Sequence, residues 1–381
     1  MVNTKSKRHN KEKEKEINKH KYNKDKEIED IEIHGEYCKG YKWYPLIWEK
    51  QKRIIAIGDL HGDFNLLINA LRLAKVIDND NNWTGGETVV VQVGDQLDGC
   101  RADVRKNENC DDPDLENLSL YSDKFPIAED VKIMEFLNDL NKQAIKAGGA
   151  IISLLGNHEL MNVNGQMNYV SYNDIQKFKN YKDPNNENLK FDTPKDARIH
   201  AFKPGNEYAK LMACSRLPAV IIGSFVFVHA GFIHAFMEKL QIKKKDDLYK
   251  ISVALRKWLL GLIDKDNVSN IINAPKEESM FWVRIINSLP KNRNNEHEEA
   301  CEDIKKVLEI FDVKSMVIGH TPQFINNKGI NSECSDQLWQ IDFGGSFAFQ
   351  KFDENNNFID LRNVQVLEIL NDKDIKVLKN K

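Results

Sequence analysis

The 381-residue sequence lacks any long, uninterrupted apolar run. Its most apolar stretch, residues 217–232, contains Pro218, Gly223, Ser224 and His229, which makes it too short and too interrupted to cross a bilayer. No basic segment followed by an apolar run opens the chain, so we expect no signal peptide. These absences predict a cytoplasmic protein with no membrane-spanning segment.

Cysteine is sparse and irregularly spaced. The six cysteines include no Cys-x-x-Cys pair, and a chain of this size needs no disulfide to support its core. We therefore expect reduced thiols. The alternative is a bond between Cys100 and Cys110, which flank one polar loop.

The sequence also lacks a strong net charge. The formal value of -3 provides no overall basic field of the kind that binds nucleic acid. Residues 1–35 are the exception, because they carry dense runs of lysine and glutamate with few apolar residues. Such a segment cannot offset its ordering entropy, so we predict a disordered charged tail there. With 41% hydrophobic residues overall, the chain can bury one large core or two ordinary ones.

Three apolar runs in the N-terminal half each end at a glycine, at Gly58, Gly94 and Gly156. Each run is typical of a buried strand. Between the first two, Asp63 is placed to cap a helix whose apolar residues recur at helical spacing. Strand, helix and strand at this spacing indicate a βαβ unit and an α/β fold. Binding sites in such folds form beyond the carboxyl ends of the strands, where polar residues follow each glycine.

Side chains that can bind metals cluster at these strand ends. Asp59 and His61 are two positions apart, so both leave the first strand on one face. Asp95 offers two carboxylate oxygens, enough to bridge two cations. Singly each residue fits a turn or a structural role, but together they favour a metal centre. The mixture of carboxylate, amide and imidazole suits Mn, Fe or Zn better than Ca or Mg. The candidates are Asp59, His61, Asp95, Asn157, His229 and His320.

Two metal ions about 4 Å apart are suited to displacement at phosphorus. They lower the pKa of a bridging water, supply hydroxide as the nucleophile and neutralise the phosphoryl oxygens. His158, next to Asn157 but not needed as a ligand, is the candidate acid that protonates the leaving group. Asp98 is the candidate for holding His158 in the correct tautomer. The sequence thus predicts a metal-dependent phosphoester hydrolase.

The motifs that carry this chemistry resemble a known family. Together they are similar to the calcineurin-like metallophosphoesterases, and more narrowly to the phosphoprotein phosphatases. The segments NWTGGETVVVQVGDQLD, GNHELMNVNG and IDFGGSFAF are most similar to the Shewanella-like phosphatase branch. The motifs are Gly-Asp-x-His-Gly at 58–62, Gly-Asp-x-x-Asp at 94–98, Gly-Asn-His-Glu at 156–159, Val-His-Ala-Gly at 228–231 and Gly-His-Thr at 319–321.

The resemblance implies a two-layered mixed β sandwich flanked by helices. It implies a single catalytic domain at 36–370, with insertions near 99–126 and 180–195 and a C-terminal tail at 371–381. It also implies that His158 pairs with Asp98. One metal would be held by Asp59, His61 and Asp95, and the second by Asp95, Asn157, His229 and His320.

The chain departs from the family at one position. The family places an arginine directly after the second aspartate of Gly-Asp-x-x-Asp, to bind phosphate oxygens, and this chain has Gly99 there. Arg101 either takes over that role through a bulge at Gly99 or is merely exposed. Arg284, in Met-Phe-Trp-Val-Arg, resembles a second arginine of the branch. Both are candidates for binding the substrate phosphate, because guanidinium pairs bidentately with it.

The leading interpretation is a phosphoprotein phosphatase acting on a phosphorylated protein or peptide, through serine/threonine or tyrosine. A second is a hydrolase of dinucleoside polyphosphates or other small phosphoesters on the same scaffold. A third, from a different class, is a binding module with an inactive site, for which Gly99 is the support. We expect no nucleic acid or membrane partner.

Overall fold

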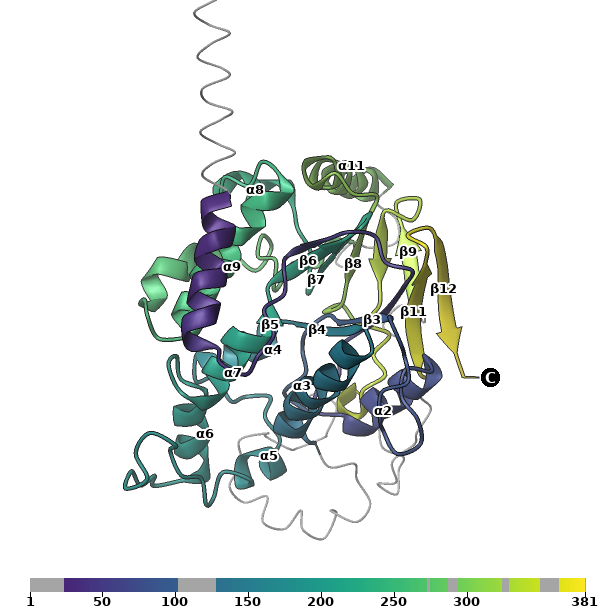
Figure 1. Cartoon of the computed structure of the whole chain (residues 1–381). Coiled ribbons are helices and arrows are strands. Elements are labelled where there is room, and N and C mark those ends of the chain that lie inside the picture. The colour runs from purple at the N-terminus through teal and green to yellow at the C-terminus, as the bar shows by residue number, and fades with distance from the viewer. Residues whose placement is uncertain are drawn as a thin grey trace, which may run out of the picture.

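The computed structural model describes residues 24–101, 128–272, 275–286, 294–323, 329–349 and 363–380. Two six-stranded sheets face each other, and helices flank them (Figure 1). This arrangement confirms the predicted α/β sandwich. Among the described residues, no helix is both long enough and apolar enough to span a bilayer.

The first sheet contains the predicted βαβ unit. β2, β3, β4 and β5 run parallel, with Ile54 opposite Val89 and Val89 opposite Ala150. β11 pairs antiparallel with β2, and β12 with β11. The strand order is β12 (Asp374–Lys379), β11 (Gln365–Leu370), β2 (Arg53–Ile57), β3 (Val89–Gln92), β4 (Ala150–Leu154) and β5 (Arg216–Leu217).

The second sheet is built around an antiparallel hairpin. β6 and β7 turn at Gly223, which has a φ of 56°, and β8 then pairs parallel with β7. The strand order is β1 (Ile47–Trp48), β6 (Ala219–Ile222), β7 (Phe225–Val228), β8 (Ser315–Ile318), β10 (Leu338–Gln340) and β9 (Asn331–Glu333).

Alternate residues of the first sheet enter two different cores. Ile54 and Ala56 pack toward the second sheet, whereas Ile55 and Ile57 pack under α2 and α3. Burial on both faces explains why these strands are continuously apolar.

Asp63 caps α2 as predicted, and its carboxylate accepts the Leu66 N–H at 2.9 Å. The helices are α2 (Phe64–Leu73), α3 (Asp130–Lys146), α4 (Asn157–Val163), α5 (Tyr172–Gln176), α6 (Pro194–Phe202), α7 (Glu207–Ser215), α8 (His234–Lys239), α9 (Leu248–Leu259), α10 (Ser269–Ile272) and α11 (Asn294–Phe311), with 3-10 turns η2 (Lys245–Asp247), η3 (Lys265–Val268) and η5 (Phe347–Phe349).

The prediction of a disordered tail over residues 1–35 is wrong for residues 24–35, which belong to a helix. Residues 24–37 form a helix that lies beside α9 (Figure 1), while residues 1–23 are outside the described part of the chain. Asp30 of this helix is fully buried and accepts hydrogen bonds from Arg256 Nε at 2.9 Å and Trp43 Nε1 at 2.9 Å. These partners order a segment whose own composition favours disorder. The predicted tail at 371–381 is also wrong over β12, which pairs along β11.

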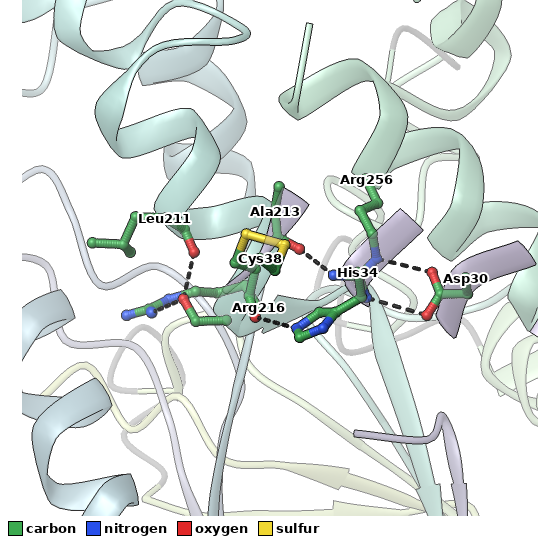
Figure 2. Close-up of a disulfide and its surroundings, with 9 residues drawn as sticks. Asp30, His34, Cys38, Leu211, Ala213, Arg216 and Arg256 are labelled. Carbon is green, nitrogen blue, oxygen red and sulfur yellow. Dashed lines mark hydrogen bonds and ion pairs between the residues drawn. A yellow bond between two sulfur atoms is a disulfide. The ribbon is translucent and has the colours of Figure 1, made fainter. Parts of the chain in front are cut away.

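The expectation of reduced thiols is wrong for the described cysteines. Cys38 is bonded to Cys214 across 176 residues of sequence (Figure 2). Cys301 is bonded to Cys334 across 33 residues. Cys100 is disulfide-bonded as well, whereas Cys110 lies outside the described residues. Pairs this distant in sequence are created by the tertiary fold, so spacing does not reveal them.

The predicted insertions are only partly visible. Residues 102–127 of the first lie outside the described chain. The second, at 180–195, contains an isolated bridge between Asp183 and Asn186 and then leads into α6.

We expect Asp30→Ala to lower the free energy of unfolding by about 3–5 kcal/mol, because it leaves the buried Arg256 guanidinium without its carboxylate partner. Urea denaturation followed by circular dichroism measures the change. Lys52→Ala, which removes the exposed ion pair to Glu87, is the control and should leave stability unchanged. Equal stability of Asp30→Ala and the unsubstituted protein would contradict the anchoring of the helix by this pair.

Candidate metal centre

The polar residues predicted to bind metal follow strands from both sheets and converge on one buried place. All six are at most 6% exposed. They are Asp59 after β2, His61 two residues later, Asp95 after β3, Asn157 at the start of α4, His229 after β7 and His320 after β8.

The Asp95 carboxylate lies at the middle of this cluster. Its Oδ2 is 3.3 Å from His229 Nε2 and 3.8 Å from His61 Nε2 and His158 Nε2. Its Oδ1 accepts the backbone N–H of His158 at 3.0 Å. The Asp95 carboxylate is therefore near the imidazoles that follow β2, β4 and β7.

Several site residues have left-handed backbone conformations. The φ angles are 46° at His61, 53° at Asp95, 73° at Asp98 and 64° at His320. This region disfavours side chains other than glycine, so the surrounding contacts must hold it in place. The Asp95 carbonyl does so for one loop, since it accepts the N–H groups of Leu60 and His61 at 2.9 Å each.

The Glu159 carboxylate holds the loop after β3. It is fully buried and accepts the N–H groups of Gly156 at 2.7 Å, Gln96 at 2.8 Å and Asp95 at 2.9 Å. The sequence motif included Glu159, but its role was not predicted. Gly156 must be small, because an added Cβ would lie 2.2 Å from Asp95 Oδ1.

The Asp59 carboxylate joins the first sheet to the second. Its two oxygens accept the His320 N–H at 3.1 and 3.0 Å. His320 Nε2 lies 3.0 Å from the Trp282 carbonyl oxygen, and Arg284 Nη1 donates to the His320 carbonyl at 3.1 Å. Arg284 is exposed, so the structure brings this candidate to the rim of the site.

The donor set fits a cation. His229 Nδ1 lies 2.9 Å from the Val93 carbonyl oxygen, and Nε2 lies 2.8 Å from Asn157 Oδ1 and 3.3 Å from Asp95 Oδ2. Burial lowers the pKa of His229, but the charge of Asp95 and the contacts with Asp95 and Val93 outweigh it and raise that pKa. The oxygen atoms around Nε2 thus favour a positive charge, which either a proton on the ring or a metal ion supplies. Carboxylate, amide and imidazole ligands together accommodate Mn, Fe or Zn.

Burial and mutual repulsion shift the pKa values of these groups. Burial raises the pKa of Asp59 well above its usual range, and the charges of Asp342 and Asp95 add to the effect. Burial also raises the pKa of Asp95, but His229 and His158 outweigh it and hold that pKa well below its usual range. Burial lowers the pKa of His61 well below the ordinary value, which favours the neutral ring that binds metals.

Asp342 is a further buried carboxylate that was not predicted as a site residue. Its Oδ1 accepts the Gly344 N–H at 2.9 Å, while Oδ2 has no hydrogen-bond partner among the described residues. Burial raises its pKa to about 6. The only sequence signal was its place in the segment IDFGGSFAF, which carried the resemblance but not a role.

His158 is held by Asp98. The distance from His158 Nδ1 to Asp98 Oδ2 is 2.6 Å, and Asn162 Nδ2 donates to Asp98 Oδ1 at 2.8 Å. Because Nδ1 carries the proton shared with Asp98, His158 Nε2 faces the cluster. The ring edge packs against Tyr169, with centroids 5.2 Å apart.

The structure places Arg101 inside the cluster. Its Nη2 lies 2.9 and 3.1 Å from the two ring nitrogens of His61 and 3.5 Å from His158 Nε2. The guanidinium packs over the rings of Tyr169 and Phe349, at 5.1 and 4.9 Å from their centroids. Glycine at position 99 allows the backbone to lie close to Ala128, since an added Cβ would be 2.6 Å from Ala128 Cβ.

Comparisons with known proteins show the family to which this chain is similar. The family model for calcineurin-like phosphoesterases matches residues 52–324. An uncharacterized protein of Acanthamoeba polyphaga mimivirus is 38% identical over 65% of this chain and 99% of its own length. Shewanella-like protein phosphatase 2 of Arabidopsis thaliana is 30% identical over 78% of this chain and 73% of its own length. The crystal structure of a cold-active protein tyrosine phosphatase from a psychrophilic Shewanella species has a similar fold, with a TM-score of 0.53, 19% identity, and coverage of 91% of this chain and 84% of that one.

We expect Gly156→Ala to weaken Mn²⁺ binding roughly 10–100-fold, the range seen when groups that orient metal ligands are disturbed. The added Cβ meets Asp95 Oδ1 and must displace it. Isothermal titration calorimetry with Mn²⁺ measures the affinity. Gly35→Ala is the control, because that helical glycine has no atom near its added Cβ, and unchanged affinity in both variants would contradict the crowding at Asp95.

Proposed function

Because the chain belongs to the calcineurin-like phosphoesterase family, we propose that it is a metal-dependent phosphoprotein phosphatase that hydrolyses phosphomonoesters of serine/threonine or tyrosine. The family implies divalent metal ions and hydrolysis of phosphoesters. The observation that carries the proposal is the convergence of the imidazoles of His61, His158 and His229, from three separate segments, on the Asp95 carboxylate.

We assign six residues to two metal ions. Asp59, His61 and Asp95 would hold one, and Asp95, Asn157, His229 and His320 the other. When bound, such a pair of ions supplies an activated water and neutralises charge on the phosphoryl group. Mn, Fe or Zn suits the donors, of which the imidazoles select against Ca and Mg.

His158 is assigned as the general acid. Its Nε2 faces the cluster, from which position it gives a proton to the leaving oxygen of the substrate. Asp98 accepts from Nδ1 and stabilises the charged imidazolium before that transfer. Asn162, which donates to the other Asp98 oxygen, keeps the carboxylate turned toward His158.

Arg101 and Arg284 are assigned to the substrate phosphate. Guanidinium groups recognise phosphate oxygens through paired hydrogen bonds. Arg101 lies against both His61 and His158, so a phosphate held between the metals and the acid is within its reach. Tyr169 and Phe349 fix the plane of that guanidinium, which reduces the entropy lost on binding.

A phosphorylated protein or peptide is the substrate best supported. The Arabidopsis relative is a Shewanella-like protein phosphatase, and the Shewanella protein of similar fold is a protein tyrosine phosphatase. The alternative of a small phosphoester such as a dinucleoside polyphosphate uses the same metal centre and differs in what contacts the leaving group.

The purified protein with Mn²⁺ should hydrolyse phosphopeptides faster than diadenosine tetraphosphate. Phosphoserine, phosphothreonine and phosphotyrosine peptides of one sequence, assayed by released phosphate, determine the preferred residue. Asp95→Asn removes the negative charge of the proposed bridging ligand and should lower turnover on every substrate. Full turnover by Asp95→Asn would contradict the assignment of the metal centre, whereas faster cleavage of the dinucleotide would contradict only the substrate.

We expect His158→Ala to lower kcat on an alkyl phosphate by about 10²–10⁴-fold, the usual contribution of a general acid. The loss should be much smaller on p-nitrophenyl phosphate, because its leaving group departs without protonation. Steady-state kinetics on both substrates measures the difference. His200→Ala, at a partly buried histidine paired with Asp183, is the control. Equal losses on the two substrates would contradict the role of His158 as the acid.

A further inference from the structure

A second group of ligand-type residues lies where α11 meets β9. His297 and Cys301 are four residues apart and therefore share one face of α11. Cys334 follows β9 directly, and Glu333 is the last residue of that strand. None of these residues belongs to the metal centre described above. The functional interpretation of the sequence gave none of them a role.

The ligand atoms of this group are close together. The potential ligand atoms of His297, Cys301 and Cys334 all lie within 4.8 Å of one another. His297 Nδ1 is 3.7 Å from Cys301 Sγ, and His297 Nε2 is 3.3 Å from Glu333 Oε2. In a tetrahedral zinc site, bond lengths of about 2.3 Å to sulfur and 2.0 Å to nitrogen separate the two ligand atoms by roughly 3.6 Å. Histidine and cysteine are thus already at ligand spacing.

We propose that the reduced protein binds a zinc-type divalent cation through Cys301 Sγ, Cys334 Sγ and His297 Nδ1, and that the disulfide between the two cysteines is the metal-free form of the same site. Water completes the tetrahedron. The side chains of His297 and Glu333 are 41% and 20% exposed, so the site is reachable from solvent.

Glu333 orients the His297 ring, and this orientation distinguishes the group from a histidine that lies near a disulfide by chance. A carboxylate that accepts from one imidazole nitrogen places the proton there and leaves the other nitrogen free to bind a metal. Glu333 faces Nε2, and Nδ1 faces the sulfur. The ring therefore presents its lone pair to the place where a thiolate-bound cation would lie.

The other described disulfide provides an internal comparison. His34 lies near the bond between Cys38 and Cys214, but its Nε2 is 3.2 Å from the Cys214 backbone carbonyl oxygen (Figure 2). That ring is engaged by the backbone, and no metal-binding group that includes Cys38 or Cys214 occurs among the described residues. Proximity of a histidine to a disulfide is thus insufficient by itself.

The conversion between the two forms balances with a simple reductant. A dithiol supplies two electrons and two protons, the sulfur–sulfur bond breaks, and two thiols form while the dithiol closes to its own disulfide. Binding of the divalent cation then releases the two thiol protons. Oxidation reverses the sequence and expels the cation, because disulfide sulfur lacks the thiolate charge that holds it.

Co²⁺ titration of the full chain tests the proposal, since thiolate ligation to Co²⁺ gives a near-ultraviolet charge-transfer band. The catalytic centre has only oxygen and nitrogen donors and does not contribute to that band. After reduction with a phosphine and its removal under argon, the protein should develop the band as Co²⁺ is added, up to the intensity of one thiolate site per chain, and Zn²⁺ should abolish it. The oxidised protein should show none.

Matched variants locate the signal. Cys334→Ser should abolish the band, His297→Ala should weaken Co²⁺ binding at least tenfold, and Glu333→Gln should weaken it roughly 10–100-fold. Cys38→Ser, which removes the comparison disulfide, should retain the band in full. Because His297→Ala and Glu333→Gln leave both cysteines in place, their Co²⁺ affinities test the proposal even if Cys334→Ser fails to fold. Absence of the band in the reduced protein, or equal affinity in His297→Ala, would overturn the proposal.

Discussion

The position of the Asp95 carboxylate is the constraint on which the rest of the site depends. It lies between the imidazoles of His61, His158 and His229, and its own backbone is held by Glu159, which follows His158 in α4. The buried Glu159 carboxylate accepts its hydrogen bonds from backbone N–H groups. That arrangement is stable because several donors surround one carboxylate, and it fixes a left-handed residue that would otherwise relax.

The two sheets contribute different kinds of side chain to the site. The parallel strands β2, β3 and β4 place Asp59, Asp95 and Asn157 side by side, because their carboxyl ends share one edge. The second sheet contributes only imidazoles, His229 and His320, from β7 and β8. The hydrogen bonds from His320 N–H to Asp59 therefore join the two layers at the site itself.

Local sequence predicted which side chains gather around Asp95, because each follows an apolar strand that ends at or near a glycine, and strand ends are recognisable from a few residues. The fold class followed from the same pattern. Contacts over long sequence distances were not predictable in this way. Asp30 is ordered by Arg256, and Cys38 is bonded to Cys214, in each case by a residue more than 170 positions away. The place of Arg101 was left open for the same reason, since it depends on Tyr169 and Phe349.

The buried carboxylates also link metal binding to folding. Asp59, Asp95 and Asp342 lie together in the core of the site, and burial raises the pKa of Asp59 and Asp342. Arg101 brings positive charge to this place, yet burial also lowers its own pKa. Under the proposed assignment, cations bound there would relieve this repulsion and would bind the native state in preference to the unfolded one. The residues assigned to the metal ions would then make the stability of this sandwich depend on metal concentration.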